Sequence, residues 1–390
     1  MKTQVGIIGA GPSGLLLAQL LHGMGIDSVV LERQTREYVL SRIRAGLLER
    51  GTAQMLRDAG AGANLETQGD EHEGVNIVFQ GQTCRIDFAK STGAKMTVYG
   101  QTELTRDLYE AQDRCGGTVL HEVSDVSLAN LDTNKPEIRF QHKDRAETLQ
   151  CDFVVGCDGY HGVSRQSIPD ADKREYENSY PFGWLGVLSE TPPVSHELIY
   201  AYHDRGFALC SMRSNMLSRY YIQVPADDDI ENWPDDKFWS ELKRRLPVDV
   251  ANSLVTGPTI EKSIAPLRSF VCEPMRWNSL FLAGDAAHIV PPTGAKGLNL
   301  AASDVHYLSQ GFKQHYQNGD SEDLRNYSER ALDRVWKSSR FSWSLTSLLH
   351  DFYEDDGGFS ARIRQAEFDY LNSSEAAQTA FAENYVGLPY

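Results

Sequence analysis

Three glycines and one glutamate near the start of the chain have the spacing of an anion-binding turn. Gly9, Gly11 and Gly14 lie between an apolar run and a stretch of helical character, and Glu32 ends the next apolar run. The first glycine permits a tight turn, the second lets the backbone approach a pyrophosphate, and the third lets strand and helix pack closely. The helix N-terminus supplies N–H groups, and the glutamate can accept hydrogen bonds from a ribose. The pattern predicts dinucleotide binding.

Two later motifs also end apolar runs with small residues and a carboxylate. One is Asp158-Gly159, and the other is Gly284-Asp285-Ala286-Ala287-His288. Small neighbours let the backbone come close to a ligand while the Asp285 carboxylate reaches hydroxyl groups, such as those of a ribityl chain. The order and wide separation of the three motifs indicate one FAD molecule that is contacted along its whole length.

The segment Gly294-Ala295-Lys296-Gly297 then opens a predicted helix. Its N-terminus would face N1 and the C2 carbonyl of a flavin and stabilise negative charge on the reduced ring. Leu298 and Asn299 would lie closest to that ring.

Polar residues alternate along two neighbouring predicted strands. Ser211 and Arg213 share one face of the first strand by the period of two, and Arg219 and Tyr221 share one face of the second. An arginine fork flanked by the hydroxyls of Ser211 and Tyr221 can hold a planar carboxylate. The alternative is that both arginines are exposed strand residues beside a hairpin loop.

A basic cluster stands out in an otherwise acidic chain. It consists of Arg33, Arg36, Arg42 and Arg44. No second Gly-x-Gly-x-x-Gly occurs in the sequence, so a nicotinamide cofactor would bind without its own Rossmann domain, in a surface groove. The alternative reading of the cluster is a solvated helix face.

The composition is that of a folded protein that binds small molecules. The 390 residues are 41% hydrophobic, and the formal net charge of −16 disfavours nucleic acid and anionic lipid surfaces as partners. The apolar stretch 5–21 is interrupted by the three motif glycines and Pro12, so it reads as strand, turn and helix and not as a signal peptide or membrane span. The six cysteines lack metal-ligand spacing, so we expect reduced, mostly buried thiols, no metal site and a cytoplasmic protein.

The elements that position these residues begin with a βαβ unit, in which apolar runs at 4–8 and 28–31 flank a helical segment at 12–23. Further along the chain the patterns predict helical spacing at Leu47, Leu48 and Met55, alternation at 75–79 and from 119 to 149, a buried strand at 152–156, a largely antiparallel sheet from 180 to 224, a helix at 238–246, a buried strand at 280–283 and a helix at 298–312.

The last part of the chain predicts a long amphipathic helix. Ser321 can cap it, with acidic residues in its first turn. We read its aromatic residues Trp336, Phe341 and Trp343 as core, with part of the helix available as a homodimer surface.

The expected fold is therefore α/β with α+β elements. The nucleotide motifs occur before, between and after the antiparallel material, so the second unit is inserted into the first. We expect a discontinuous Rossmann-like FAD-binding domain at 1–70, 98–175 and 266–320, an interleaved β-sheet substrate domain at 71–97 and 176–265, and a helical C-terminal region at 321–390.

Together these residues resemble the class A flavoprotein aromatic hydroxylases. The likeness covers nearly the whole chain, through residues 1–50, Val98-Tyr99-Gly100-Gln101-Thr102-Glu103 and residues 157–168, 180–224, 261–270, 280–305 and 383–389. With the motif residues, it implies an FAD site made of Gly9, Gly11, Ser13, Gly14, Glu32, Arg42, Arg44, Gln101, Asp158, Asp285, Gly297, Leu298 and Asn299. It implies nicotinamide contacts at Arg33, Gln34, Tyr38, Arg44, His161 and Arg268. A guanidinium at Arg33 beside the Tyr38 hydroxyl suits a 2′-phosphate, which favours NADPH over NADH.

The resemblance also implies a substrate and a proton path. The substrate would be 4-hydroxybenzoate, hydroxylated at C3 with O2 through a flavin hydroperoxide. Ser211, Arg213, Tyr221 and Arg219 would bind its acid group. A phenol is mostly protonated at neutral pH, whereas its phenolate activates the ring. The implied path for the proton is Tyr200, Tyr385 and His72, and the carbonyl of Pro292 would lie near the substrate hydroxyl.

Other functions remain open at this level. The nearest is a hydroxylase of another phenolic acid, and one from a different class is a noncatalytic FAD-binding redox sensor. A flavin halogenase is disfavoured because no Trp-x-Trp-x-Ile-Pro occurs, and a disulfide reductase because no Cys-x-x-x-x-Cys follows the first helix.

Overall fold

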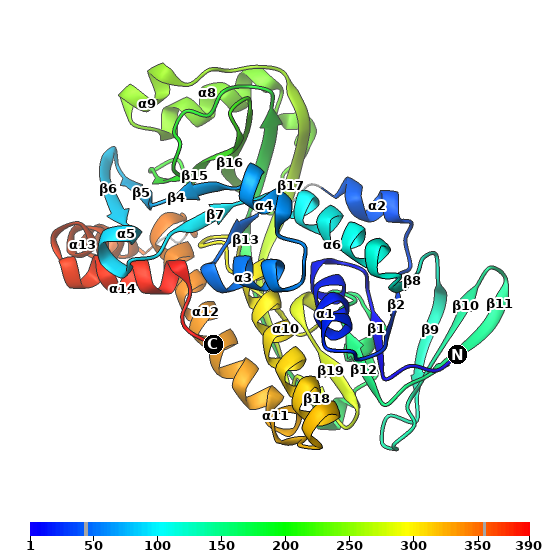
Figure 1. Ribbon diagram of the computed structural model, residues 1–390. Helices are drawn as coiled ribbons and strands as arrows, with labels where there is room; N and C mark the ends of the chain where they lie inside the picture. Colours follow the sequence, from blue (N-terminus) through cyan, green and yellow to red (C-terminus); the bar gives the residue numbers. More distant parts are fainter. Residues whose placement is uncertain (43–45, 354–355) are drawn as a thin grey trace.

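The described residues form two large β-sheets and two three-stranded sheets, with helices packed against them (Figure 1). The computed structural model describes residues 1–42, 46–353 and 356–390. Arg44, which is predicted to bind FAD and NADPH, lies outside the described residues.

The first large sheet is the predicted Rossmann-like unit, and its strand order is β18-β19-β12-β1-β2-β8. Neighbours from β19 to β8 are parallel. All four residues of β1 are buried, as expected of a parallel strand covered on both faces. The strands are β1 (Val5–Ile8), β2 (Ser28–Leu31), β8 (Thr118–Leu120), β12 (Phe153–Gly156), β18 (Arg276–Trp277) and β19 (Leu280–Leu282). Because parallel strands end at one edge, the segments after β1, β12 and β19 meet there.

The second large sheet has the order β20-β17-β13-β16-β15-β14-β5-β6 and is antiparallel except for the β14–β5 pair. Its strands are β5 (Gly74–Phe79), β6 (Gln82–Asp87), β13 (Arg174–Ser189), β14 (Ile199–Tyr202), β15 (Ala208–Ser214), β16 (Leu217–Pro225), β17 (Thr259–Glu273) and β20 (His288–Ile289). The predicted antiparallel sheet is confirmed and is larger than its sequence signal.

The two small sheets have the orders β11-β10-β9 and β3-β7-β4. The first contains β9 (Ser124–Ala129), β10 (Glu137–His142) and β11 (Arg145–Gln150), and the second contains β3 (Leu47–Leu48), β4 (Asp70–His72) and β7 (Met96–Val98). The helical spacing predicted at Leu47 and Leu48 is wrong, because both residues pair with β7 and are buried there.

The helices cover the sheets and form the C-terminal region. They are α1 (Pro12–Gly23), α2 (Arg36–Ser41), α3 (Arg50–Asp58), α4 (Ala63–Gln68), α5 (Phe88–Thr92), α6 (Gln101–Cys115), α7 (Val163–Gln166), α8 (Asp235–Arg245), α9 (Val248–Ser253), α10 (Gly297–Lys313), α11 (Glu322–Arg325), α12 (Tyr327–Leu349), α13 (Phe359–Ser373) and α14 (Glu375–Val386). Helix α1 begins with proline at its first turn and packs against α6 and α10. Each of its buried leucines contributes about 1.5–3 kcal/mol by leaving water.

The predicted C-terminal helix is interrupted. Asn326 separates α11 from α12. Ser321 stands at the N-cap position of α11, but its side chain makes no capping hydrogen bond, and its hydroxyl bonds instead to Nδ1 of His315 at 2.8 Å. Phe341 is buried as predicted, but Trp336 is 41% and Trp343 54% exposed. The period of 3.6 places Trp343 on another face of α12 from Phe341.

Long strands join the two large units. The predicted domain boundaries near 175 and 265 fall inside β13 and β17, which pair with each other along most of their length. The division into domains therefore stays a prediction. All six cysteines are free and four of them are buried, in line with the expected thiols.

Candidate active site

The three glycine-containing motifs lie against one another. A β carbon on Gly9, whose φ is +104°, would lie 2.3 Å from the carbonyl oxygen of Cys157, just before Asp158. A β carbon on Gly284, whose φ is +62°, would lie 3.0 Å from Oγ of Ser13. These close approaches require glycine at both positions. The first motif therefore contacts both the second and the third, as a single ligand spanning them would need.

The glutamate that ends β2 is bound to the first turn. Oε2 of Glu32 accepts a hydrogen bond from the Ala10 N–H at 2.8 Å, and Oε1 accepts one from the Gln34 N–H at 2.9 Å. The side chain is buried and rigidly held. Each carboxylate oxygen can accept a second bond, so a ribose hydroxyl would find an oriented acceptor.

The two aspartates of the later motifs occupy different environments. Oδ2 of Asp158 accepts hydrogen bonds from the N–H and the hydroxyl of Ser164, both at 2.9 Å, while Oδ1 is buried and has no partner in the part of the chain that the structure describes. Burial raises the pKa of the Asp158 carboxyl. Asp285 is exposed between buried neighbours in the turn Gly284–Ala286. Asp158 therefore holds the turn into α7, and Asp285 projects from the motif edge.

The start of α10 is fixed through an asparagine side chain. Oδ1 of Asn299 accepts from the Glu49 N–H and the Thr52 hydroxyl, and Nδ2 donates to the carbonyls of Leu47 and Ala295, at 2.8–2.9 Å. These four bonds use all the hydrogen-bonding capacity of the amide. A contact between Asn299 and FAD would therefore come from its backbone.

The residues present fit a bound dinucleotide. A β carbon on Gly11 or Gly297 would meet no atom within 4 Å, and φ of Gly11 is −74°, which any residue adopts. Neither packing nor backbone strain requires glycine at Gly11. The missing side chain therefore leaves space for a ligand. Ser13 and Gln101 are partly buried and Arg42 is exposed beside this edge of the sheet. Space, an oriented carboxylate and an uncapped helix start are what a pyrophosphate and ribose need.

Substitution Gly11→Ala is expected to weaken FAD binding while leaving the melting temperature of the apoprotein unchanged, because the new methyl group enters only the ligand's space. Flavin fluorescence titration and thermal unfolding of the apoprotein measure the two effects. Gly14→Ala is the contrasting variant, since its β carbon would lie 2.0 Å from the Gly9 carbonyl oxygen and should destabilise the apoprotein itself. Unchanged FAD affinity in Gly11→Ala would remove this turn from the site.

The predicted nicotinamide contacts form two groups. Arg33 and Gln34 precede α2 and Tyr38 lies within it, and both Arg33 and Tyr38 are exposed. On the other side, the guanidinium of Arg268 lies 4.8 Å from the ring centre of Tyr160, and the His161 ring lies 5.0 Å from the same ring. The structure thus places both His161 and Arg268 beside Tyr160, whereas the other group lies in and before α2.

The predicted substrate residues lie on one face of the second large sheet. Tyr200 of β14 is directly opposite Leu209 of β15, and Leu209 is directly opposite Tyr221 of β16. Opposite residues share a face, and Ser211 follows Leu209 on that face by the period of two. The register of β15 and β16 shifts between Met212 and Ser214, so Arg213 is placed by its hydrogen bond to Ser211 and not by the period.

The arginine of this face is already oriented. Nη1 of Arg213 donates to Oγ of Ser211 at 2.9 Å. Burial lowers the pKa of the Arg213 guanidinium, which nevertheless stays charged because arginine does not lose its proton in proteins. A partly desolvated guanidinium with a hydroxyl beside it is a strong site for a carboxylate.

Arg219 has other partners. Its Nη1 lies 3.0 Å from Oε1 of Glu261, and Nη2 donates to Oγ of Ser263 at 3.3 Å. Both partners are on β17, and the guanidinium also lies 5.3 Å from the ring centre of Tyr221. A direct contact between Arg219 and substrate stays a prediction.

Two buried tyrosines that are far apart in the sequence meet at this face. The hydroxyls of Tyr200 and Tyr385 are 3.1 Å apart, and either can donate. Burial raises the pKa of both phenols, and for Tyr200 the hydrogen bonds from Tyr385 and the Gly294 backbone and the charge of Arg213 oppose that rise. Both hydroxyls therefore stay protonated at neutral pH and can exchange a proton by reversing the direction of their hydrogen bond.

The other two predicted catalytic residues are His72 and Pro292. His72 of β4 is buried, and neither ring nitrogen has a hydrogen-bond partner among the described residues. Burial, followed by the repulsion of His196, lowers the pKa of His72 to about 4, so the ring is neutral near pH 7. Pro292 is exposed, and its carbonyl accepts from the Ala295 N–H at 3.0 Å, which leaves one lone pair for a ligand.

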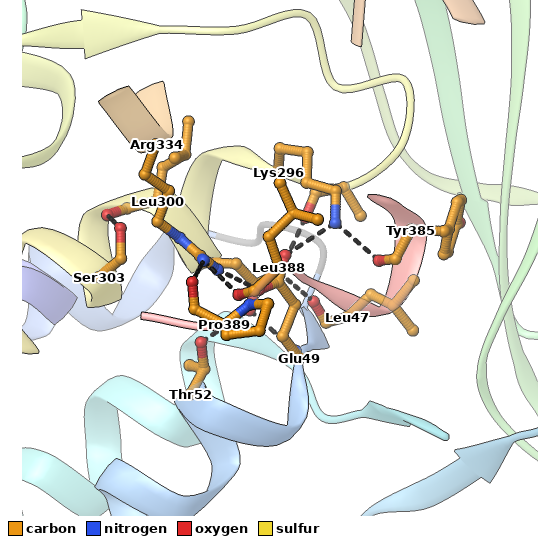
Figure 2. Close-up of polar contacts among 12 residues, drawn as sticks. Leu47, Glu49, Thr52, Lys296, Leu300, Ser303, Arg334, Tyr385, Leu388 and Pro389 are labelled. Atoms are coloured by element: carbon orange, nitrogen blue, oxygen red, sulfur yellow. Dashed lines mark hydrogen bonds and ion pairs between the residues drawn. The ribbon is translucent and has the colours of Figure 1, made fainter. Parts of the chain in front are cut away.

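A buried charge cluster, which the sequence did not reveal, holds α10 and the C-terminal segment together (Figure 2). Nζ of Lys296 lies 2.7 Å from Oε1 of Glu49 and donates to the carbonyl of Tyr385 at 2.6 Å. Nη2 of Arg334 lies 2.8 Å from Oε2 of Glu49. Its Nη1 donates to the carbonyls of Leu388 and Pro389. The cluster therefore positions the backbone that carries Tyr385.

Substitution Glu49→Ala is expected to destabilise the fold by about 3–5 kcal/mol, because it leaves two buried cations without their carboxylate. The matched control is Glu66→Ala, which breaks the exposed 2.6 Å pair with Arg57 and should cost less than about 1 kcal/mol. Denaturant unfolding of both variants measures the difference, and equal costs would contradict the role given to the cluster.

The sequence signals for these supporting residues were weak. In the sequence, Lys296 belongs to a glycine-rich loop, and Glu49 and Arg334 look like ordinary helix-flanking charges. Only the fold reveals that they are buried together.

Among the described residues, no helix is both long and apolar enough to cross a membrane.

Comparison with known proteins places the chain among flavoproteins. The family model described as FAD binding domain matches residues 2–342. The whole chain aligns with 96% of p-hydroxybenzoate hydroxylase from Acinetobacter baylyi at 54% identity. The 3-(3-hydroxy-phenyl)propionate/3-hydroxycinnamic acid hydroxylase of Comamonas testosteroni is 21% identical over 97% of this chain and 63% of its own length. The crystal structure of p-nitrophenol 4-monooxygenase from Pseudomonas putida DLL-E4 shares the fold, with a TM-score of 0.83, 17% identity and full coverage of both chains.

Proposed function

The chain belongs to the family of FAD-dependent aromatic hydroxylases, and on that premise we propose that it hydroxylates 4-hydroxybenzoate at C3 to 3,4-dihydroxybenzoate with NADPH and O2. The observation that supports this substrate best is the register of β14, β15 and β16. It places Tyr200 and the Arg213–Ser211 pair on one face of one sheet. A guest with an acid at one end and a phenol at the other matches that arrangement.

The acid end of the substrate would be held by Arg213. Its guanidinium can form two parallel hydrogen bonds with a carboxylate, and Ser211 and Tyr221 add hydroxyl donors. Gly186 lies opposite Tyr221, and a β carbon there would lie 2.6 Å from the Tyr221 ring. The glycine thus lets the ring lie flat over the sheet. Binding of the acid group would therefore fix the position of the substrate's aromatic ring.

The phenol end would be ionised by the tyrosine pair. Tyr200 accepts the substrate proton while passing its own to Tyr385, and the reversed hydrogen bonds then stabilise the phenolate. Pro292 offers only a carbonyl, which orients the neutral phenol before ionisation. Because both tyrosines are buried, the proton needs a further carrier to reach solvent, and in this proposal that carrier is His72. The phenolate makes the carbon ortho to its oxygen nucleophilic.

The FAD would be held by the three motifs, with Glu32 at its ribose, Asp285 at its ribityl chain, and Ser13, Arg42, Gln101 and the start of α10 completing the site. Bound FAD supplies the redox chemistry that activates O2 for transfer to the ring. NADPH would bind between the Arg33–Tyr38 segment and the His161–Arg268 pair, with Arg33 at the 2′-phosphate. These assignments rest on the positions described above.

We further propose a cytoplasmic homodimer. Exposed large apolar side chains gather on α12 and α13, namely Trp343, Phe359, Ile363 and Tyr370. Such residues are typical of surfaces that a partner covers.

The test of the function is a comparison of benzoate isomers. With FAD-loaded protein, 4-hydroxybenzoate should stimulate NADPH oxidation and give an equal amount of hydroxylated product, whereas the 2- and 3-hydroxy isomers should not. Coupled turnover with another isomer only would assign a different phenolic acid. No stimulated NADPH oxidation by any isomer would favour the redox-sensor alternative.

A further inference from the structure

A second histidine lies on the solvent side of His72. The ring centres of His72 and His196 are 5.0 Å apart and their planes are inclined by 51°. The His196 side chain is 56% exposed, while His72 is 1% exposed. The His72 ring is therefore shielded from water, whereas the neighbouring His196 ring is in contact with water.

Strand pairing explains why the two rings meet. β14 and β5 run parallel, with Ile199 opposite Asn76. His196 precedes β14 and His72 precedes β5, so both lie at the same edge of the sheet. The segment that carries His196 continues directly into Tyr200.

An aspartate fixes the outer imidazole. Oδ1 of Asp70 lies 2.9 Å from Nε2 of His196. Asp70 and His72 are two residues apart on β4, so they share a face. The other charges nearby are paired elsewhere: Arg85 holds Glu197 with two bonds of 2.7 Å, and Lys95 lies within 3 Å of Glu71 and Glu73. Asp70 is thus available to stabilise a protonated His196.

His72 by itself is a poor final acceptor of a proton. Its ring is buried without a hydrogen-bond partner among the described residues, a state that costs free energy and calls for a physical explanation. The low pKa of His72, caused first by burial and then by His196, and opposed by Asp70 and Glu197, means that a proton arriving there is not retained near pH 7. It must move on to a group that exchanges with water.

We propose that His196, oriented by Asp70, takes the substrate proton from His72 and releases it to bulk water. The inference rests on the proposed hydroxylase function and extends its proton path by one residue. The step is a balanced proton transfer: one N–H bond breaks at His72 and one forms at His196, directly or through one bridging water. His196 acts through His72 and does not touch the substrate.

The test follows proton release when FAD-loaded enzyme binds 4-hydroxybenzoate, with a pH-indicator dye in stopped flow and the phenolate absorbance recorded in parallel. His196→Gln should slow proton release by at least about tenfold, leave the final phenolate absorbance unchanged, and recover when imidazole is added at high concentration. Asp70→Asn should give a smaller slowing. His22→Gln, which alters an exposed histidine on α1, should behave as wild type.

The outcomes separate the inference from the function on which it rests. If wild-type enzyme ionises and hydroxylates the substrate but His196→Gln releases protons at the wild-type rate, the inference is wrong and the function stands. A slowing that imidazole does not relieve would mean a structural role and would also overturn it. If wild-type enzyme shows no phenolate signal, the proposed function and the inference fail together.

Discussion

Replacing Arg213 by glutamine is expected to raise the KM for 4-hydroxybenzoate by about two to four orders of magnitude, because two charge-assisted hydrogen bonds worth about 1.5–3 kcal/mol each are lost. The value of kcat at saturating substrate should change much less, since the carboxylate is held equally before and during the reaction. Steady-state assays of coupled NADPH oxidation and product formation measure both quantities. Arg213→Lys keeps the charge but loses the fork and should fall between glutamine and wild type.

The control for this prediction is Arg205→Gln on the loop between β14 and β15. Arg205 is exposed and pairs with Glu241, which Arg245 also holds at 3.1 Å. Its removal should leave KM unchanged. An Arg213→Gln variant with the wild-type KM would show that the acid group binds elsewhere and would invalidate the assigned orientation of the substrate.

Replacing Tyr200 by phenylalanine is expected to lower kcat by about 100-fold or more, because the hydroxyl that receives the substrate proton is gone. The phenolate spectrum of bound substrate should disappear at neutral pH, while KM changes little because Arg213 still holds the acid. Raising the pH should partly restore the rate of this variant, since a phenol with a pKa of about 10 ionises in water without help. Rapid-scan absorbance and pH–rate profiles provide the measurements.

Tyr202→Phe is the matched control on the same strand. Tyr202 is also buried, but its hydroxyl bonds to Nη2 of Arg364 at 3.2 Å and is assigned no part in the proton path. The variant should retain wild-type kcat and phenolate formation. Full activity and a normal phenolate spectrum in Tyr200→Phe would exclude the tyrosine pair from the reaction.

The sequence was sufficient where local pattern and ligand chemistry coincide. The first βαβ unit follows from the glycine turn, Pro12 and the two apolar runs, and its helix has the predicted bounds. The period of two predicted common faces for Ser211 and Tyr221, and the register of β15 and β16 confirms that these faces coincide, whereas the register shift between Met212 and Ser214, where Arg213 lies, was not predicted. The meeting of Tyr200 with Tyr385 came from the family resemblance, and their hydroxyls are indeed 3.1 Å apart.

The sequence was insufficient where long-range packing decides. The apolar pair Leu47 and Leu48 fits a helix locally, yet pairing with β7 makes it a strand. His196 and Glu49 belong to no periodic pattern, and their partners are distant in sequence or depend on buried geometry. The partners that occupy Arg219 lie on β17, a strand whose register no local signal encodes.

The most direct test of the account is a turnover of FAD-loaded protein with NADPH and 4-hydroxybenzoate under ¹⁸O2, followed by mass spectrometry of the aromatic product. The account predicts 3,4-dihydroxybenzoate that carries one ¹⁸O atom in its new hydroxyl group. Product that contains only oxygen from water, or NADPH oxidation that yields hydrogen peroxide and unchanged 4-hydroxybenzoate, would contradict it.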